Sequence, residues 1–270
     1  MTDLAHPLAP YASDLIQRIW GDEWRIAEER KLWLAVMRFQ AWHGIEIPPR
    51  ALAAYADASS IDLDSIRQRE MVTKHDVKAR LEEYNHVASK IYGAPLELAH
   101  LGMTSADVVD NISLVQMRRS LENLYVISNS EQERLLDACL RIPFRGIKGP
   151  VGTQQDQLDL LGSAEACDLL DITCAAIWGF GSVMNSVGQV YPRSIDFGVA
   201  SAVMFACSTH QHEPGERSPW HPVLRGYFKM IGDYCDSQWN EGDISTSAIR
   251  RVALPGLFLA ADCLLRDVRP

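Results

Sequence analysis

Hydrophobic residues recur along the chain at the three- and four-residue spacing of amphipathic helices. The first such stretch follows Asp22, which we expect to cap it, and continues through Phe39 to a C-terminal cap at Gly44. Residues 61–91 show the same mixed spacing, and we expect one break within them. The pattern therefore predicts helices throughout the first part of the chain.

A long helix is predicted after Thr104. Thr104 and Asp107 have the spacing of a capping box, and the residues that follow form two apolar stripes. A helix that is apolar on two sides is expected inside a bundle. No run alternates apolar and polar residues between turn signals, as strands would require. The sequence thus predicts an all-α fold with one continuous helical body.

Composition places the chain among ordinary globular proteins, with 270 residues of which 47% are hydrophobic and 23% charged. Its net charge of −9 argues against nucleic acid as the main partner. The apolar run at 252–265 is too short and interrupted to span a bilayer, and no secretory signal begins the chain. We therefore expect a cytoplasmic protein without a membrane partner. Its six cysteines lack metal-binding spacing and are expected to be reduced, mostly buried thiols.

Four short polar segments are unusual for a plain helix bundle. The first contains Lys74, His75 and Asp76, which alone would be interpreted as a solvated helix start. In the second, hydroxyl and N–H groups at Thr104 and Ser105 could cap a helix or bind a carboxylate or phosphate. The segments are residues 73–80, 100–111, 145–155 and 241–251.

The other two segments favour structural interpretations when taken alone. The glycines of 145–155 do not have the order of a phosphate-binding loop, so a turn between helices is predicted. Arg250 and Arg251 cannot face the same side of a helix, so one should point inward and need an anionic partner. His210 and His212 would diverge on a helix, and no third ligand is evident, so we expect no metal site.

Taken together and in order, these segments resemble the adenylosuccinate lyases of the fumarase and aspartase superfamily. The resemblance covers most of 8–128, then 144–207 and about 225–265. It implies a long-helix bundle with an N-terminal domain over 1–103 and a central bundle over 104–270, without the family's C-terminal domain. The matching stretches are PYASDLIQRIW, TKHDVKA, HLGMTSADVVDN, RGIKGPVGTQQDQLDLL, NSVGQVYPRSIDFGVASA and QWNEGDISTSAIRRVALPGLFLAADCLL.

The resemblance implies a β-elimination that uses no metal or organic cofactor. Adenylosuccinate would give AMP and fumarate, and succinyl-aminoimidazole-carboxamide ribotide would be cleaved likewise. It also implies a homotetramer whose active sites are shared between subunits. The implied site residues are His75 and His100 as catalytic histidines, with Tyr11, Lys74, Asp76, Thr104, Ser105, Gln189, Ser247 and Arg251 binding the substrate.

The chain departs from the family pattern at several positions. Pro10 stands where the family has an arginine before the tyrosine, and Gly242 stands at another arginine position. The segment with the general-acid histidine is not found near 128–131, and the loop with the base serine is not found near 210–218.

Four alternatives follow from these departures. The acid and base segments could be internal segments, near Asn129–Glu131 and Gln211–Ser218, that this sequence leaves out. Alternatively, the chain could be a shortened or engineered descendant that lacks them and is nearly inactive. It could also be a short enzyme that uses His210, His212 or His221 as the acid. The fourth alternative is a helical scaffold that binds purine nucleotide without cleaving adenylosuccinate.

Overall fold

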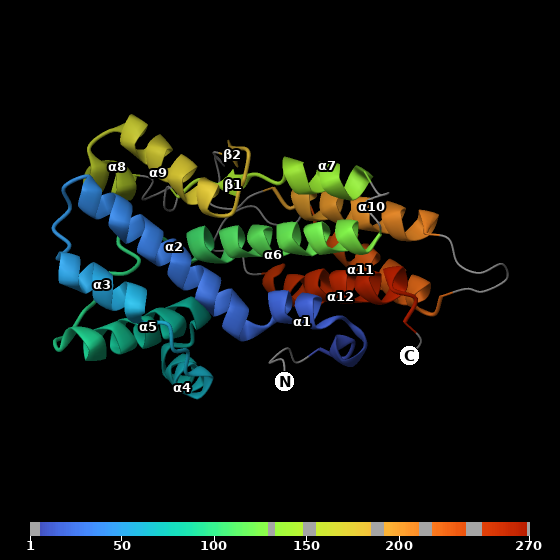
Figure 1. The fold of residues 1–270 in the computed structure, drawn as a ribbon, viewed down its shortest axis with the longest axis horizontal. Helices are drawn as coiled ribbons and strands as arrows, with labels where there is room; N and C mark the ends of the chain where they lie inside the picture. The colour runs from blue at the N-terminus through green and yellow to red at the C-terminus, as the bar shows by residue number, and fades with distance from the viewer. Residues whose placement is uncertain are drawn as a thin grey trace. The chain divides into compact units, whose positions relative to one another are not determined.

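The computed structural model describes residues 6–128, 133–147, 155–184, 192–210, 218–235 and 245–268. The all-α prediction is confirmed, because strands in these ranges are limited to one parallel pair, β1 and β2, of two residues each (Figure 1). No helix in the described part is long and apolar enough to cross a membrane. In chain order the elements are η1 (Ala9–Tyr11), α1 (Asp14–Trp20), α2 (Asp22–Trp42), α3 (Pro49–Asp57), α4 (Leu63–Thr73), α5 (Asp76–Tyr92), α6 (Ser105–Ile127), α7 (Glu133–Arg141), β1 (Phe144–Arg145), α8 (Gln155–Leu161), α9 (Ala164–Ile177), β2 (Val183–Met184), α10 (Ser194–Thr209), α11 (Trp220–Tyr234) and α12 (Ser247–Leu265).

Contacts within the chain divide it into two compact units, each built from segments distant in sequence. Unit 1 comprises Met1–Asp22, Ser113–Pro143 and Val190–Pro270, and unit 2 comprises Glu23–Ile112 and Phe144–Gln189. Helix α6 passes from unit 2 into unit 1. The domain boundary expected at residue 103 stays a prediction.

Helix α12 is the centre of unit 1, and every residue from Ala253 to Leu265 is buried. It packs against α1, α10 and α11, and Figure 1 shows α11 beside it. Its one carboxylate in that range, Asp262, accepts hydrogen bonds of 2.7 Å from both the backbone N–H and the hydroxyl of Ser13. These bonds, with one from Arg266 Nε at 3.0 Å, explain how an apolar helix tolerates a buried carboxylate.

In unit 2, helices α2, α3 and α5 surround an aromatic core. Trp33, Tyr55 and Tyr84 are buried there together, and the rings of Tyr55 and Tyr84 lie 5.0 Å apart. The break expected within 61–91 is confirmed at Lys74 and His75, between α4 and α5. Asp22 is the first residue of α2 instead of its cap. From that position its carboxylate still interacts favourably with the positive N-terminal end of the helix dipole.

Two buried ion pairs join α2 to α5. Arg80 Nε donates to Glu29 Oε2 at 2.6 Å, and Arg30 pairs with Glu83. Arg30 also donates to the carbonyl of Ala58 at 2.7 Å. Because each buried charge has a partner of opposite sign, the two ion pairs fix the position of α5 along α2. These two helices also carry the candidate site.

Candidate active site

The turn at 99–104 carries several of the predicted site residues into the start of α6. His100 has a φ of 77°, in the left-handed region that a residue other than glycine adopts at a cost in conformational energy. The N–H of Met103 closes the turn on the His100 carbonyl at 3.1 Å. Thr104 then donates its N–H to Asp107 Oδ2 at 2.9 Å, which is one half of the predicted capping box.

Two helices hold this turn through side chains. From α2, Trp33 Nε1 donates to His100 Nδ1 at 2.9 Å, and Gln40 Nε2 donates to the Leu101 carbonyl at 2.9 Å. From α8, Gln157 Nε2 donates to the Leu101 carbonyl at 3.2 Å and to the Gly102 carbonyl at 3.0 Å. Trp33 and Gln40 are two turns apart on one face of α2, so a single helix face positions both the ring and the backbone of the turn.

His75 lies at the corner between α4 and α5. Lys74, the residue before it, ends α4 in a left-handed conformation with a φ of 54°, and its N–H donates to the Glu70 carbonyl. His75 caps α5 by accepting the Lys78 N–H at its Nδ1 at 3.3 Å, and its side chain is half-exposed. Because the cap uses only Nδ1, the rest of the half-exposed imidazole, including Nε2, remains accessible to a ligand.

Asp76 has an internal partner. Its Oδ2 accepts from Arg80 Nη1 at 3.2 Å, and Arg80 is fixed on its other side by Glu29. Asp76 therefore anchors the start of α5, and this contact accounts for its carboxylate without a substrate.

Burial and a neighbouring histidine both act on His100. Burial lowers the pKa of His100 to about 4, and the charge of His75 contributes in the same direction. His100 is consequently neutral near pH 7, and the two histidines from separate motifs are electrostatically coupled. The structure thus brings His75, His100, Thr104 and Ser105 into one region of unit 2.

The first residues of α6 present hydroxyl groups. Thr104 Oγ1 is buried without a hydrogen-bond partner among the described residues, and Ser105, the first helical residue, is partly exposed. A hydroxyl beside a helix N-terminus can donate to an anionic oxygen, and the helix dipole favours the same charge.

A buried polar cluster supports the start of α6, and sequence reasoning missed it. Arg145 pairs with Asp107 and lies with its Nε 3.8 Å from Asp110 Oδ2. Asn111 receives the Arg145 N–H at 2.8 Å and donates to the Arg145 carbonyl at 2.9 Å. The spacing of Asp107, Asp110 and Asn111 on one helix face was the available signal, but it did not reveal Arg145 as the partner. The rest of the turn predicted at 145–155 lies mostly outside the described residues.

Three predicted substrate contacts belong to unit 1. Tyr11 is 38% exposed and accepts at its carbonyl from Arg266 Nη2 at 2.9 Å. Ser247 begins α12 and is partly exposed, and Arg251 on the same helix is exposed. The prediction that one of two adjacent arginines points inward is confirmed. Arg250 is buried, and its Nε donates to Asp196 Oδ2 at 2.9 Å.

Several predicted positions fall in the gaps between the described ranges. Gln189, His212 and Gly242 lie outside the described residues, as do most of the segments near 128–131 and 210–218. His210 is described, and its Nε2 lies 3.5 Å from Asp267 Oδ2. Within the described ranges, no group of three or more His, Cys, Asp or Glu residues is arranged to hold a metal ion.

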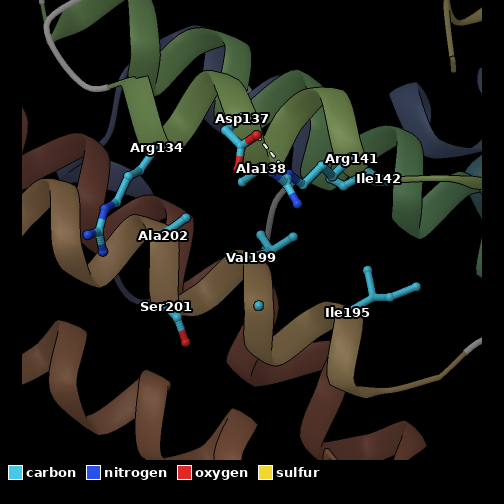
Figure 2. A pocket seen from close by; sticks show the side chains of 10 residues that line it. Arg134, Asp137, Ala138, Arg141, Ile142, Ile195, Val199, Ser201 and Ala202 are labelled. Atoms are coloured by element: carbon cyan, nitrogen blue, oxygen red, sulfur yellow. Dashed lines mark hydrogen bonds and ion pairs between the residues drawn. The ribbon is translucent and has the colours of Figure 1, made fainter.

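Two cavities lie away from the predicted residues. A cavity of about 480 Å³ in unit 1 is lined by α7 and α10, with Arg134 and Arg141 on one side and Val199 on the other (Figure 2). A cavity of about 630 Å³ in unit 2 lies along α5 and includes Lys78 and His86. Neither is lined by a predicted site residue.

Comparison with known proteins bears directly on the motifs. No family model matches the chain. It is 24% identical to adenylosuccinate lyase of Saccharomyces cerevisiae over 94% of this chain and 70% of that protein. It is 25% identical to adenylosuccinate lyase of Schistosoma mansoni over 94% of this chain and 69% of that protein. By sequence, its relatives are adenylosuccinate lyases. The resemblance that the motifs indicated is confirmed.

Solved structures show the same fold. A 3-carboxy-cis,cis-muconate lactonizing enzyme from Pseudomonas putida aligns with a TM-score of 0.72 over 96% of this chain and 74% of that chain, at 13% identity. A fumarate lyase from Mesorhizobium sp. BNC1 aligns with a TM-score of 0.66 over 95% of this chain and 74% of that chain, at 15% identity. The fold is therefore the long-helix bundle of the fumarase and aspartase type.

The adenylosuccinate lyase alignments also show a difference in length. The alignment with the Saccharomyces cerevisiae adenylosuccinate lyase has 339 columns but includes only 94% of the 270 residues, about 254 of them. About 85 columns of that alignment therefore have no residue of this chain opposite them. The aligned part of the yeast adenylosuccinate lyase is therefore longer than the part of this chain that it matches.

Proposed function

We propose that this chain is a carbon–nitrogen lyase that cleaves adenylosuccinate by β-elimination to AMP and fumarate. Succinyl-aminoimidazole-carboxamide ribotide would be cleaved in the same way. The observation that carries the proposal is that His75 is near enough to lower the pKa of His100, which lies in the turn leading to Thr104 and Ser105 at the start of α6. The similarity to adenylosuccinate lyases over 94% of the chain supports it.

The substrate carries carboxylates, and this region suits them. The buried Thr104 hydroxyl can donate to a carboxylate oxygen, and Ser105 adds a second hydroxyl at the same helix end. Lys74 and His75 are both exposed at the corner before α5, where they can approach a second anionic group. The net charge of −9 does not oppose this, because local groups decide the field at the site.

In β-elimination, the proton removed lies next to a carboxylate, and negative charge develops on that carboxylate. Donors already aimed at those oxygens stabilise the developing charge without reorganising, which is worth a factor of about 10² to 10³ per donor. We assign that role to Thr104, Ser105 and His100, and we assign His75 to the reacting part of the substrate. An acid must also protonate the leaving nitrogen.

The nucleotide part would contact Tyr11, Gln189, Ser247 and Arg251, as the motif resemblance implies. Arg251 offers a positive charge for the phosphate, and its side chain is exposed. Its neighbour Arg250 is buried and donates to Asp196. Lys74 and Asp76 would stand beside the histidine, with Asp76 acting by positioning α5 through Arg80. No cofactor or metal is part of the proposed reaction.

A second candidate function is a helical module that binds purine nucleotide without cleaving adenylosuccinate. The observation that favours it is the absence from the sequence of the family's acid-histidine and base-serine motifs, together with about 85 unmatched alignment columns. Loss of a general acid and a general base removes a factor of about 10² to 10⁴ each. Binding of AMP with negligible turnover would favour this candidate.

Turnover of adenylosuccinate by the purified chain tests the proposal. Fumarate release would be followed by chromatography, on protein whose intact mass matches 30.2 kDa. We expect His75→Ala and His100→Gln to lower turnover by about 10²-fold or more, while the control His86→Ala, within α5, leaves it unchanged. Unaltered helical circular dichroism shows that the variants fold. If the wild-type chain neither cleaves adenylosuccinate nor binds AMP, both candidate functions are wrong.

The expected assembly is a homotetramer with active sites shared between subunits. Several large apolar side chains are exposed in unit 1, where a second copy could cover them. The exposed apolar side chains are Val126 on α6, Leu136 and Leu140 on α7, and Phe197 and Phe205 on α10. A monomer by light scattering at micromolar concentration would contradict the shared-site assembly.

A further inference from the structure

The hydrogen bond between Trp33 and His100 determines where the imidazole carries its proton. An indole N–H only donates, so the nitrogen that receives it must have a free lone pair. Trp33 Nε1 lies 2.9 Å from His100 Nδ1, so Nδ1 is the accepting nitrogen. A neutral imidazole has a single N–H, and that hydrogen must then be on Nε2.

The indole is held firmly enough to impose this choice. Trp33 is fully buried, its ring lies 5.9 Å from the ring of Tyr84, and the two rings are within 23° of parallel. Tyr84 is itself fixed, because its hydroxyl donates to the Tyr55 carbonyl at 2.9 Å. The indole meets the imidazole edge-on, with ring planes at 78°. The donor therefore cannot turn away without repacking the aromatic core of unit 2.

The backbone of His100 is held in place from a second direction. Its left-handed φ of 77° costs conformational energy, which the surrounding contacts must offset. Gln40 donates to the next carbonyl, that of Leu101, and lies on the same face of α2 as Trp33. One helix face thus fixes both the strained backbone and the ring of His100.

We propose that Trp33 is a positioning residue that keeps His100 as the neutral imidazole protonated on Nε2, so that His100 donates a hydrogen bond to the substrate and does not act as a base. The proposal rests on the proposed function for its substrate, but the tautomer is a property of the free protein. The lowered pKa of His100 agrees, since burial and the charge of His75 both disfavour the imidazolium. To act as a base, His100 would have to use the lone pair on Nδ1 that Trp33 already occupies.

Nitrogen NMR of the histidine ring tests the proposal directly. The chain would be labelled with 15N-histidine, and two-bond proton–nitrogen correlations at neutral pH would distinguish protonated from unprotonated ring nitrogens. His100→Gln identifies the His100 signals by their disappearance. In the wild-type chain we expect Nε2 protonated and Nδ1 unprotonated.

Trp33→Phe removes the donor and keeps an aromatic ring. Without it we expect the ratio of the Nε2-protonated to the Nδ1-protonated form to fall about fivefold, the equivalent of one ordinary hydrogen bond. The matched control is Trp178→Phe, because Trp178 is also a buried indole donor of unit 2, to Glu28 Oε2 at 2.7 Å. That variant should leave the His100 signals unchanged.

Each outcome decides the proposal. A wild-type His100 protonated on Nδ1 overturns it, as does an unchanged tautomer ratio in folded Trp33→Phe. If Trp33→Phe does not fold, the wild-type tautomer and the loss of the downfield Trp33 indole proton signal in His100→Gln still decide the hydrogen bond. Failure to cleave adenylosuccinate, with the expected tautomer present, counts against the proposed function and leaves the positioning role of Trp33 intact.

Discussion

Replacing Gly102 by alanine measures how firmly the turn after His100 is held. Gly102 has a φ of 67°, and a left-handed conformation costs an L-residue about 1 to 2 kcal/mol. Gly93 provides a matched control, because its φ is 86° and nothing lies within 4 Å of a Cβ placed there. Gly93→Ala therefore reports the backbone cost alone.

At Gly102 the added carbon also meets neighbouring side chains. A Cβ there would lie 2.6 Å from Leu160 Cδ1 and 2.8 Å from Gln157 Nε2. Leu160 is partly exposed and can move, but Gln157 is fully buried and can move only by releasing the Leu101 and Gly102 carbonyls. Two lost hydrogen bonds cost about 1 kcal/mol each. We expect Gly102→Ala to lower the free energy of unfolding by about 3 kcal/mol and Gly93→Ala by about 1 kcal/mol.

Urea unfolding followed by both circular dichroism and tryptophan fluorescence would measure the difference. Two probes are needed because the chain has two compact units, whose transitions need not coincide. If the two variants are destabilised equally, to within about 0.5 kcal/mol, Gln157 does not hold the turn as described. Turnover of adenylosuccinate should fall in Gly102→Ala and not in Gly93→Ala, since only the first displaces the turn that carries His100.

Three further variants test other parts of the structure. Gly256→Ala should destabilise unit 1 by about 1 to 3 kcal/mol in urea unfolding, because the added Cβ would collide with Cε1 and Cζ of Tyr227. Alanine has the better helix propensity, so an increase in stability would contradict that contact. Arg145→Met should lower the free energy of unfolding by about 3 to 5 kcal/mol, because the buried carboxylates of Asp107 and Asp110 lose their cation. Arg141→Met removes an exposed ion pair and should lower it by less than about 1 kcal/mol. Equal losses in the two variants would refute this interpretation. Between about pH 4 and 6.5, the folded chain holds His100 neutral while the unfolded chain protonates it, so stability falls as the pH is lowered through this range. His100→Gln should therefore reduce the dependence of the melting temperature on pH in that range. Parallel curves for the two proteins would count against the lowered pKa.

The helical elements could be predicted because their signals are local. Apolar spacing and caps identified α2, the break before α5 and the start of α6 near Thr104. The pairing of β1 with β2 escaped prediction, since two residues are too few to show alternation and their partners are 39 positions apart, as with Phe144 and Val183. The inward orientation of one of two adjacent arginines was also a local matter of helix geometry.

The candidate site could be predicted only in part. His75, His100, Thr104 and Ser105 came from motifs whose order resembles a family. Trp33 is buried in the core of unit 2, and its N–H also donates to His100. A buried tryptophan on an apolar helix face looks the same in the sequence whether or not its nitrogen has such a partner. The role of Gln40 was missed for the same reason.

By itself, the sequence determined that this chain is helical, where α2 and α6 begin, that a break separates α4 from α5, and which family its motifs resemble. The helical signals depend on residues three or four positions apart, which the pattern records directly. Tertiary structure alone decided that Asp196 is the partner of Arg250, that Arg145 supports α6 and that His100 is neutral. Those outcomes depend on burial and on partners that are distant in sequence, and protonation follows from the environment that these partners create.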